Sequence, residues 1–175
     1  LWGRDDLLPM WVADMDFRPP EAVVQAVTQR AQHGIYGYEK RPASFDEAVL
    51  GWLQSRHGWD VDPAWLIHTP GVVAGLTFAV LALTEPGERV VIQPPVYPPF
   101  FAILRSNGRE VVENPLVESG GRYVMNFEEL EEFFRSGVKT MMLCSPHNPV
   151  GRVWTKEELE TLAELVLKYD VTVLS

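Results

Sequence analysis

The chain has 175 residues, 46% of them hydrophobic and 22% charged, which is the composition of an ordinary globular domain with an apolar core. Its 24 acidic residues outnumber its 15 basic ones, and the formal net charge of -9 has the wrong sign for a general nucleic-acid-binding surface. The longest apolar run, 72–83, is interrupted by Gly75 and Thr77 and is shorter than the roughly 20 residues of a membrane-spanning helix, so neither nucleic acid nor a membrane is an expected partner.

Two helices are predicted in the first third of the chain. The first covers about 20–33, begins with proline where proline is tolerated, and ends before Gly34. The second is predicted to begin with Ser44 as its N-cap and Glu47 three residues later, a pair typical of a capping box, and to end near His57 before Gly58.

Strands and helices are predicted to alternate in the remainder of the chain. The apolar runs with the length and composition of strands are 65–68, 89–93, 110–113, 140–144 and 171–174. Helices are predicted at 72–83 and 97–106. This alternation indicates an α/β fold of three layers, in which a mostly parallel sheet is covered by helices on both faces.

Two further capping boxes predict two later helices. Asn126 with Glu129 begins one, and Thr155 with Glu158 begins the other. In the second helix we expect one face to pack inward, because its apolar residues recur at helical spacing. These residues are Leu159, Leu162, Ala163 and Val166.

The single cysteine and the two chain ends carry further expectations. Cys144 follows an apolar run and is expected to be a buried thiol in a reducing compartment, which favours a cytoplasmic protein without a secretory signal. The chain begins with Leu1 and stops within an apparent strand at Ser175. We therefore expect it to be a piece of a longer protein.

A turn and a predicted helix start follow the first predicted strand. In "TPGVVAGL", residues 69–76, Gly71 comes directly before the helix, whose free amides at Val72 and Val73 could bind a phosphate. The alternative is that Gly71 is only a turn glycine. The spacing fits neither the dinucleotide-binding glycine motif nor the nucleotide P-loop.

A tyrosine among prolines follows the second predicted strand, in "QPPVYPPF", residues 93–100. Proline restricts the backbone, so Tyr97 could be held as a stacking surface for a flat heterocycle. Its alternative role is to pack the loop onto the core.

An asparagine between prolines follows the strand that ends at Cys144. Asn148 carries a donor and an acceptor and could bond a ring oxygen, although Asn-Pro also simply favours a turn. The sequence gives His147, beside it, no role beyond that turn. Because ligand sites in parallel sheets form at the carboxyl ends of the strands, an anion site, a ring platform and a polar anchor there together indicate a phosphorylated aromatic cofactor.

These residues resemble those of a known family, the fold-type I pyridoxal-phosphate enzymes of the aminotransferase class I/II superfamily, and within it the cystathionine β-lyase group. The resemblance covers the whole chain, and its motifs are "PMWVADMDFRPPEAV" at 9–23, "YGYEKRP" at 36–42, "TPGVVAGL", "QPPVYPPF" and "SPHNPVGRVWTKEEL" at 145–159. It implies pyridoxal 5'-phosphate as the cofactor and no metal.

The resemblance also implies roles for individual residues. Those matched to the cofactor are Val72 and Val73 at the phosphate, Tyr97 on the pyridine ring and Asn148 at the phenolic oxygen. Tyr38 matches a tyrosine that reaches the phosphate held by the other subunit, which implies a homodimer. Its alternative is a core tyrosine at a helix start, and Tyr36 lies only two residues away. Ala13 and Asp14 match a loop near the substrate carboxylate.

The same resemblance implies that part of the enzyme is missing. Residues 1–35 match a segment of the small domain, and 36–175 match the first half of an aspartate aminotransferase-like large domain. The lysine that holds the cofactor is expected beyond Ser175, so no catalytic residue is assigned and the 175 residues alone are expected to be inactive.

The implied activity is a β-lyase that releases a thiol, pyruvate and ammonia from cystathionine or cysteine conjugates. One alternative is an aminotransferase on the same fold. An alternative of another class is the non-catalytic, aminotransferase-like sensor domain of a transcription regulator, which the acidic charge does not favour.

Overall fold

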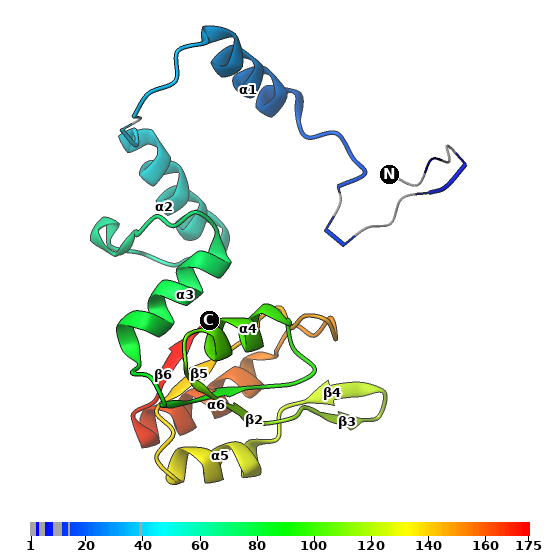
Figure 1. The fold of residues 1–175 in the computed structure, drawn as a ribbon, viewed down its shortest axis with the longest axis vertical. Coiled ribbons are helices and arrows are strands. Elements are labelled where there is room, and N and C mark those ends of the chain that lie inside the picture. Colours follow the sequence, from blue (N-terminus) through cyan, green and yellow to red (C-terminus); the bar gives the residue numbers. More distant parts are fainter. Residues whose placement is uncertain (1–2, 4–5, 9–11, 14, 39) are drawn as a thin grey trace. The chain divides into compact units, whose positions relative to one another are not determined.

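The structure, a computed structural model, describes residues 3, 6–8, 12–13, 15–38 and 40–175. The chain divides into two compact units, Leu1–Pro63 and Ala64–Ser175, and each is described by itself. The domain boundary expected after residue 35 refers to the whole protein and stays a prediction. Figure 1 traces the elements in chain order. No helix within the described parts of the chain has the length and apolarity needed to cross a membrane.

The described residues of the first unit form two α-helices, α1 (Glu21–His33) and α2 (Ala43–His57). Both end at a glycine in the left-handed region, Gly34 and Gly58, as the sequence predicts. The predicted cap at Ser44 is wrong. The N-cap is Pro42, in an extended conformation, so Ser44 lies inside the first turn, where its side chain cannot cap the helix start.

The second unit is built on a four-stranded parallel sheet with the order β2-β1-β5-β6. Its strands are β1 (Arg89–Ile92), β2 (Glu110–Glu113), β5 (Thr140–Met142) and β6 (Thr172–Leu174). Its helices are α3 (Val72–Leu83), α4 (Pro99–Ser106), α5 (Phe127–Arg135) and α6 (Lys156–Tyr169). The predicted alternation of strands and helices is confirmed for these elements.

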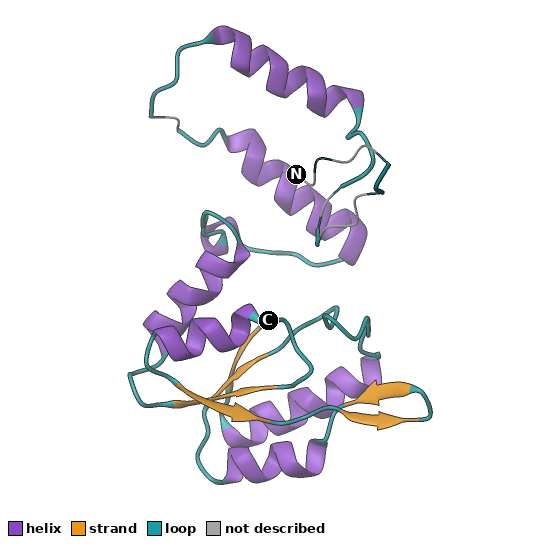
Figure 2. Cartoon of the chain, turned by 45° about the vertical axis from the view of Figure 1, so that its right-hand side comes forward, coloured by secondary structure: helices purple, strands orange, loops and turns teal. Residues whose placement is uncertain are grey.

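Helices cover both faces of this sheet, as Figure 2 shows. Successive strand residues point to opposite faces, so Val91 and Met141 belong to one apolar cluster and Val90 and Met142 to the other. The first cluster contains residues of α5 and α6, whereas the second contains residues of α3 and α4. The three-layer α/β architecture expected from the sequence is therefore present.

The predicted strand 65–68 is wrong. A short 3-10 helix, Pro63–Trp65, takes the start of this segment, and the residues after it are irregular. Trp65 is 67% exposed and Ile67 is 86% exposed, so in the described chain neither side chain gains the burial that a strand needs.

A hairpin that the sequence analysis missed follows β2. Its strands are β3 (Val117–Ser119) and β4 (Arg122–Val124), paired antiparallel. Gly120 and Gly121 form the turn with φ of 60° and 77°, values that a two-residue hairpin loop requires and that glycine adopts without strain. Figure 1 shows the hairpin projecting beyond the end of β2.

The caps of α5 and α6 are confirmed. The Asn126 side chain accepts from the Glu129 amide, and Thr155 and Glu158 form a complete capping box. The predicted inward face of α6 is only half right, because Leu159 and Ala163 are exposed. The residues that pack inward are Leu162, Leu165, Val166 and Tyr169. This stripe has the same spacing and offers more apolar surface.

Arg109 fixes the end of α3 at the edge of the sheet opposite the strand ends. Its Nη2 donates to the Thr84 carbonyl oxygen at 2.5 Å and its Nε to the Thr84 hydroxyl at 2.9 Å. Thr84 is the C-cap of α3, and both residues are buried. A charged donor on the residue directly before β2 therefore satisfies a carbonyl at the helix end that no helical amide reaches.

Candidate cofactor site

Two candidate residues follow adjacent strands at the same edge of the sheet. β1 and β5 are hydrogen-bonded neighbours and run parallel, so their carboxyl ends lie together. Tyr97 lies in the loop after β1, and Asn148 lies in the loop after β5. The loops are joined directly, because Nε2 of His147 lies 3.0 Å from the carbonyl oxygen of Pro95. The fold brings these two candidates to one place.

Tyr97 is a half-buried ring in the loop just before α4. It packs against the apolar cluster under α4, and its ring meets that of Phe100 edge to face, with centroids 6.1 Å apart and planes at 83°. Val96, beside it, is buried. Tyr97 therefore also has the alternative role, because its ring packs the loop onto the core. Its partial exposure leaves surface on which a flat ligand could stack.

Asn148 lies on an exposed turn. Its backbone N–H donates to the Sγ of Cys144 at 3.4 Å, so the turn folds back onto the end of the strand. Cys144 is half-buried rather than buried as predicted, because it lies past the end of β5, where the covering helices no longer enclose it. The side-chain amide of Asn148 is therefore accessible to a ligand.

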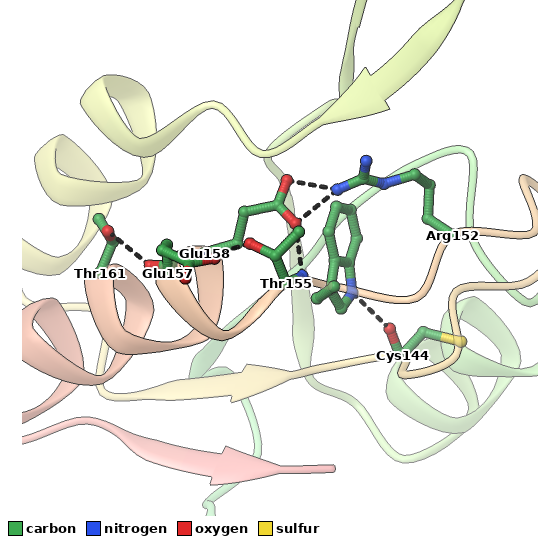
Figure 3. A network of polar contacts seen from close by, with 7 residues as sticks. Cys144, Arg152, Thr155, Glu157, Glu158 and Thr161 are labelled. Carbon is green, nitrogen blue, oxygen red and sulfur yellow. Dashed lines mark hydrogen bonds and ion pairs between the residues drawn. The ribbon is translucent and has the colours of Figure 1, made fainter.

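A network of polar contacts holds the far end of the Asn148 loop, as Figure 3 shows. Arg152 pairs with both carboxylate oxygens of Glu158, which also accepts from the Thr155 amide at 2.7 Å. Trp154 donates from its indole nitrogen to the carbonyl oxygen of Cys144. The loop is thereby tied to the first turn of α6 and to the end of β5.

The N-terminus of α3 is the segment expected to bind an anion. Gly71 is the N-cap with φ of 106°, a conformation that residues with a side chain rarely adopt. Val72 and Val73 are exposed, and as the first residues of a helix their amides have no intrahelical acceptor. A phosphate could accept from both amides and gain from the helix dipole.

The direction of α3 places this N-terminus towards the edge where the strands end. α3 leads into β1 through the short turn 84–88, closed by the Glu88 amide on the Glu85 carbonyl. Val80 of α3 packs in the same cluster as Val90 and Ile92 of β1. A helix that packs on the strand it precedes, after so short a turn, runs antiparallel to it, so its start lies towards the strand's carboxyl end.

A buried amide network under the site was also missed by the sequence analysis. Gln93 and Asn114 are each at most 1% exposed, and the Gln93 amide donates to the Asn114 side-chain oxygen at 3.1 Å. Asn114 in turn donates to the Glu129 carboxylate at 2.8 Å and to the Asn126 carbonyl oxygen at 3.1 Å. The polar residues directly after β1 and β2 were a sequence signal, but their partner on α5 is distant in sequence.

The remaining candidates belong to the first unit. Tyr38 is fully exposed, while the neighbouring Tyr36 donates its hydroxyl to the Ala31 carbonyl oxygen at 2.6 Å. The alternative of a core tyrosine therefore does not describe Tyr38. Ala13 is exposed with a positive φ of 62°, and Asp14 lies outside the described residues.

The groups present at this edge of the sheet fit pyridoxal phosphate. Helix amides suit its phosphate, an anchored tyrosine ring suits its pyridine, and an accessible amide suits its ring oxygen. Within the parts of the chain that are described, no cluster of three or more histidine, cysteine or carboxylate side chains could bind a metal.

The chain is similar to several known proteins. The chain is 51% identical to cystathionine beta-lyase PatB of Bacillus subtilis over all of its length, which is 46% of that protein, and 33% identical to protein MalY of Escherichia coli, covering 99% of the chain and 45% of that protein. The chain thus spans about half the length of the curated relatives it matches.

Solved structures are similar over a comparable share. Cystalysin from Treponema denticola, which contains a pyridoxal 5'-phosphate cofactor, has a TM-score of 0.91 at 36% identity, covering 97% of this chain and 43% of that one. The PLP-bound C-S lyase from Staphylococcus hominis has a TM-score of 0.89 at 33% identity, covering 97% and 45%. The family described as aminotransferase class I and II matches residues 5–175, and the chain therefore belongs to that family.

Proposed function

We propose that this chain is the first half of a pyridoxal-phosphate-dependent carbon–sulfur β-lyase. In the whole protein the substrate is cystathionine or a cysteine conjugate, and the products are a thiol, pyruvate and ammonia. The observation that carries the proposal is the direct contact between the Tyr97 and Asn148 loops at the ends of β1 and β5. The 51% identity to a protein named cystathionine beta-lyase supports this reaction.

Each residue of the site has a defined task in this proposal. The amides of Val72 and Val73 bind the phosphate, the ring of Tyr97 stacks on the pyridine, and the amide of Asn148 donates to the ring oxygen. Each hydrogen bond to the charged phosphate contributes roughly 1.5–3 kcal/mol, whereas stacking contributes about 0.5–1.5 kcal/mol. The helix amides therefore provide most of the affinity from this half, while Tyr97 and Asn148 orient the ring.

When bound, pyridoxal phosphate supplies an electron-accepting ring that allows the substrate to lose a proton next to its amino group and then its sulfur substituent. The ring of Tyr97 would stack on the cofactor's ring and the side-chain amide of Asn148 would bond its ring oxygen, so that together they would orient it. The lysine that carries the cofactor is expected outside these 175 residues. We therefore propose that the chain alone is inactive and retains the cofactor weakly.

The finer assignments are also proposals. Tyr38 reaches the phosphate of the partner subunit in a homodimer, which its full exposure permits. Ala13 and Asp14 lie on the loop near the substrate carboxylate. Residues 1–35 belong to the small domain and 36–175 to the large one, and the enzyme acts in the cytoplasm.

The test is an assay of the full-length protein with cystathionine in the absence of any keto acid. A β-lyase releases pyruvate and a free thiol under these conditions, at a rate that depends on added pyridoxal phosphate. If amino-group transfer requires a keto acid and no pyruvate appears without one, the protein is an aminotransferase. Cofactor binding without either reaction would indicate the non-catalytic sensor.

A further inference from the structure

His147 is a buried residue in an otherwise accessible turn. It is 1% exposed, whereas the residues on both sides of it, Pro146 and Asn148, are exposed. A polar ring costs free energy when it leaves water unless its nitrogen finds a partner. The hydrogen bond and ring contacts of His147 therefore indicate why this side chain is buried.

The His147 ring connects the two loops of the site. Its Nε2 lies 3.0 Å from the Pro95 carbonyl oxygen, an acceptor 52 positions earlier in the chain. Because a carbonyl can only accept, Nε2 carries the proton. Burial lowers the pKa of the imidazole below its usual value, so the ring is neutral at pH 7 and donates this one bond as a neutral group.

The rest of the residue is fixed as firmly. The His147 amide donates to the Arg152 carbonyl oxygen at 2.7 Å, and its own carbonyl accepts from the Gly151 amide at 2.8 Å. Its ring meets the indole of Trp154 edge to face, with centroids 5.3 Å apart and planes at 83°. These contacts close the turn that presents Asn148.

The two residues joined by this hydrogen bond lie close in sequence to Tyr97 and Asn148, which orient the cofactor in the proposed function. Pro95 lies two residues before Tyr97, and His147 lies directly before Asn148. We propose that His147 is a positioning residue, whose bond to Pro95 fixes the Asn148 amide relative to the Tyr97 ring. The inference rests on the proposed function, since it concerns how the same site is held.

A purely structural role is the competing explanation. In that case the ring only fills space beside Trp154, and any side chain of similar volume would serve. The two roles separate in a pair of substitutions. His147→Phe keeps a planar ring against Trp154 but removes the donor to Pro95, whereas His147→Gln loses the ring and keeps an N–H at a comparable reach.

The experiment uses the full-length protein and measures two properties of bound pyridoxal phosphate. The first is the dissociation constant from fluorescence titration of the apoprotein. The second is the pH midpoint of the cofactor's absorbance, which responds to the hydrogen bond at the ring oxygen. Asn148→Ala gives the full effect of losing that bond, and His57→Gln, an exposed residue at the end of α2, is the matched control.

We expect His147→Phe to weaken cofactor binding about fivefold, the effect of one lost net hydrogen bond, and to shift the midpoint in the direction of Asn148→Ala. His147→Gln should restore both values towards those of the unsubstituted protein. Should His147→Phe not fold, His147→Asn replaces it, because its shorter amide cannot reach Pro95. We expect the dissociation constant and pH midpoint of His147→Asn to resemble those of Asn148→Ala more closely than those of His147→Gln do.

The result that overturns the inference is a folded His147→Phe protein of lowered melting temperature but unchanged dissociation constant and midpoint. Equal values for the glutamine variant and the variant without the donor would overturn it as well. These outcomes leave the proposed function intact, since the unsubstituted protein still binds the cofactor. If the unsubstituted protein does not bind pyridoxal phosphate, both the proposed function and this inference fail.

Discussion

Trp154 is hydrogen-bonded to Cys144 across the base of the Asn148 loop, because its indole Nε1 donates to the Cys144 carbonyl oxygen at 3.0 Å. Cys144 follows β5, whereas Trp154 is the residue before the N-cap of α6. The bond therefore closes the loop at the point where it enters and leaves the core. Trp154 is 4% exposed, so water does not replace the bond easily.

Replacing this indole should destabilise the fold. Trp154→Phe removes the donor and some buried apolar volume, and we expect the free energy of unfolding of the full-length protein to fall by about 1–3 kcal/mol. Urea titration followed by circular dichroism measures it. Trp65→Phe is the control, because Trp65 is 67% exposed and its replacement should change the value by less than about 0.5 kcal/mol. Equal losses in the two variants would contradict the role assigned to the bond.

The amide network under the site gives a second prediction. Asn114→Ala removes two hydrogen bonds, the one that the buried Gln93 amide donates to Asn114 and the one that Asn114 donates to the Glu129 carboxylate. We expect a loss of about 1–3 kcal/mol in the free energy of unfolding, measured by urea titration. Asn107→Ala is the comparison, because the Asn107 side chain makes one bond, to the Ile103 carbonyl oxygen at a helix end. A larger effect at Asn107 would show that the network contributes little.

The N-terminus of α3 gives a third prediction, in which two glycines respond in opposite directions. Gly71→Ala places a side chain at φ of 106°, which should strain the helix start, lower the melting temperature and weaken pyridoxal-phosphate binding. Gly51→Ala lies within α2, where an added Cβ meets nothing within 4 Å, and should raise helix stability by about 1 kcal/mol. Cofactor affinity unchanged by Gly71→Ala would argue against phosphate binding at this helix.

Glu131 gives a prediction on pH. Hydrogen bonds from Lys168 and Tyr169 lower the pKa of its carboxyl from 4.5 to about 2, and Lys168 lies 2.7 Å away. The folded state thus favours the charged form. Its stabilisation is present above the unfolded pKa near 4.5 and disappears as the pH falls towards 2.

The measurement compares the melting temperature of the unsubstituted protein with that of Glu131→Gln across this range. The difference should be largest above about pH 5, shrink as the pH approaches 2, and decrease in high salt because the cluster is accessible to solvent. Glu132→Gln, at the next position of α5, is the control for removing an exposed carboxylate from the same helix. A constant difference for Glu131→Gln would refute the assigned pKa shift.

Local features of the fold could be predicted from the sequence. The caps of α5 and α6 join residues three positions apart, so Asn126 with Glu129 and Thr155 with Glu158 are readable directly. The two inner strands, β1 and β5, are short apolar runs that are buried on both faces. By contrast, the N-cap of α2 is Pro42, two residues before the predicted Ser44, because a proline with fixed φ competes with a serine for the same boundary.

Features that depend on distant contacts could not be predicted. Segment 65–68 has strand-like residues, but strand formation needs a neighbour, and the sequence does not say whether one is available. The same holds for His147, whose acceptor is the Pro95 carbonyl oxygen. The positions of Tyr97 and Asn148 at strand ends were predictable from the alternation of elements, whereas the bond that joins their loops was not.

The attachment of Arg109 to Thr84 has an electrostatic consequence for the opposite end of the same helix. The carboxyl end of α3 carries partial negative charge, and a guanidinium bonded there compensates it. The amide end at Val72 and Val73 keeps its partial positive charge, about 18 Å away for a helix of 12 residues. α3 is thus a dipole whose negative pole is already satisfied within the protein and whose positive pole is left for an anion from outside.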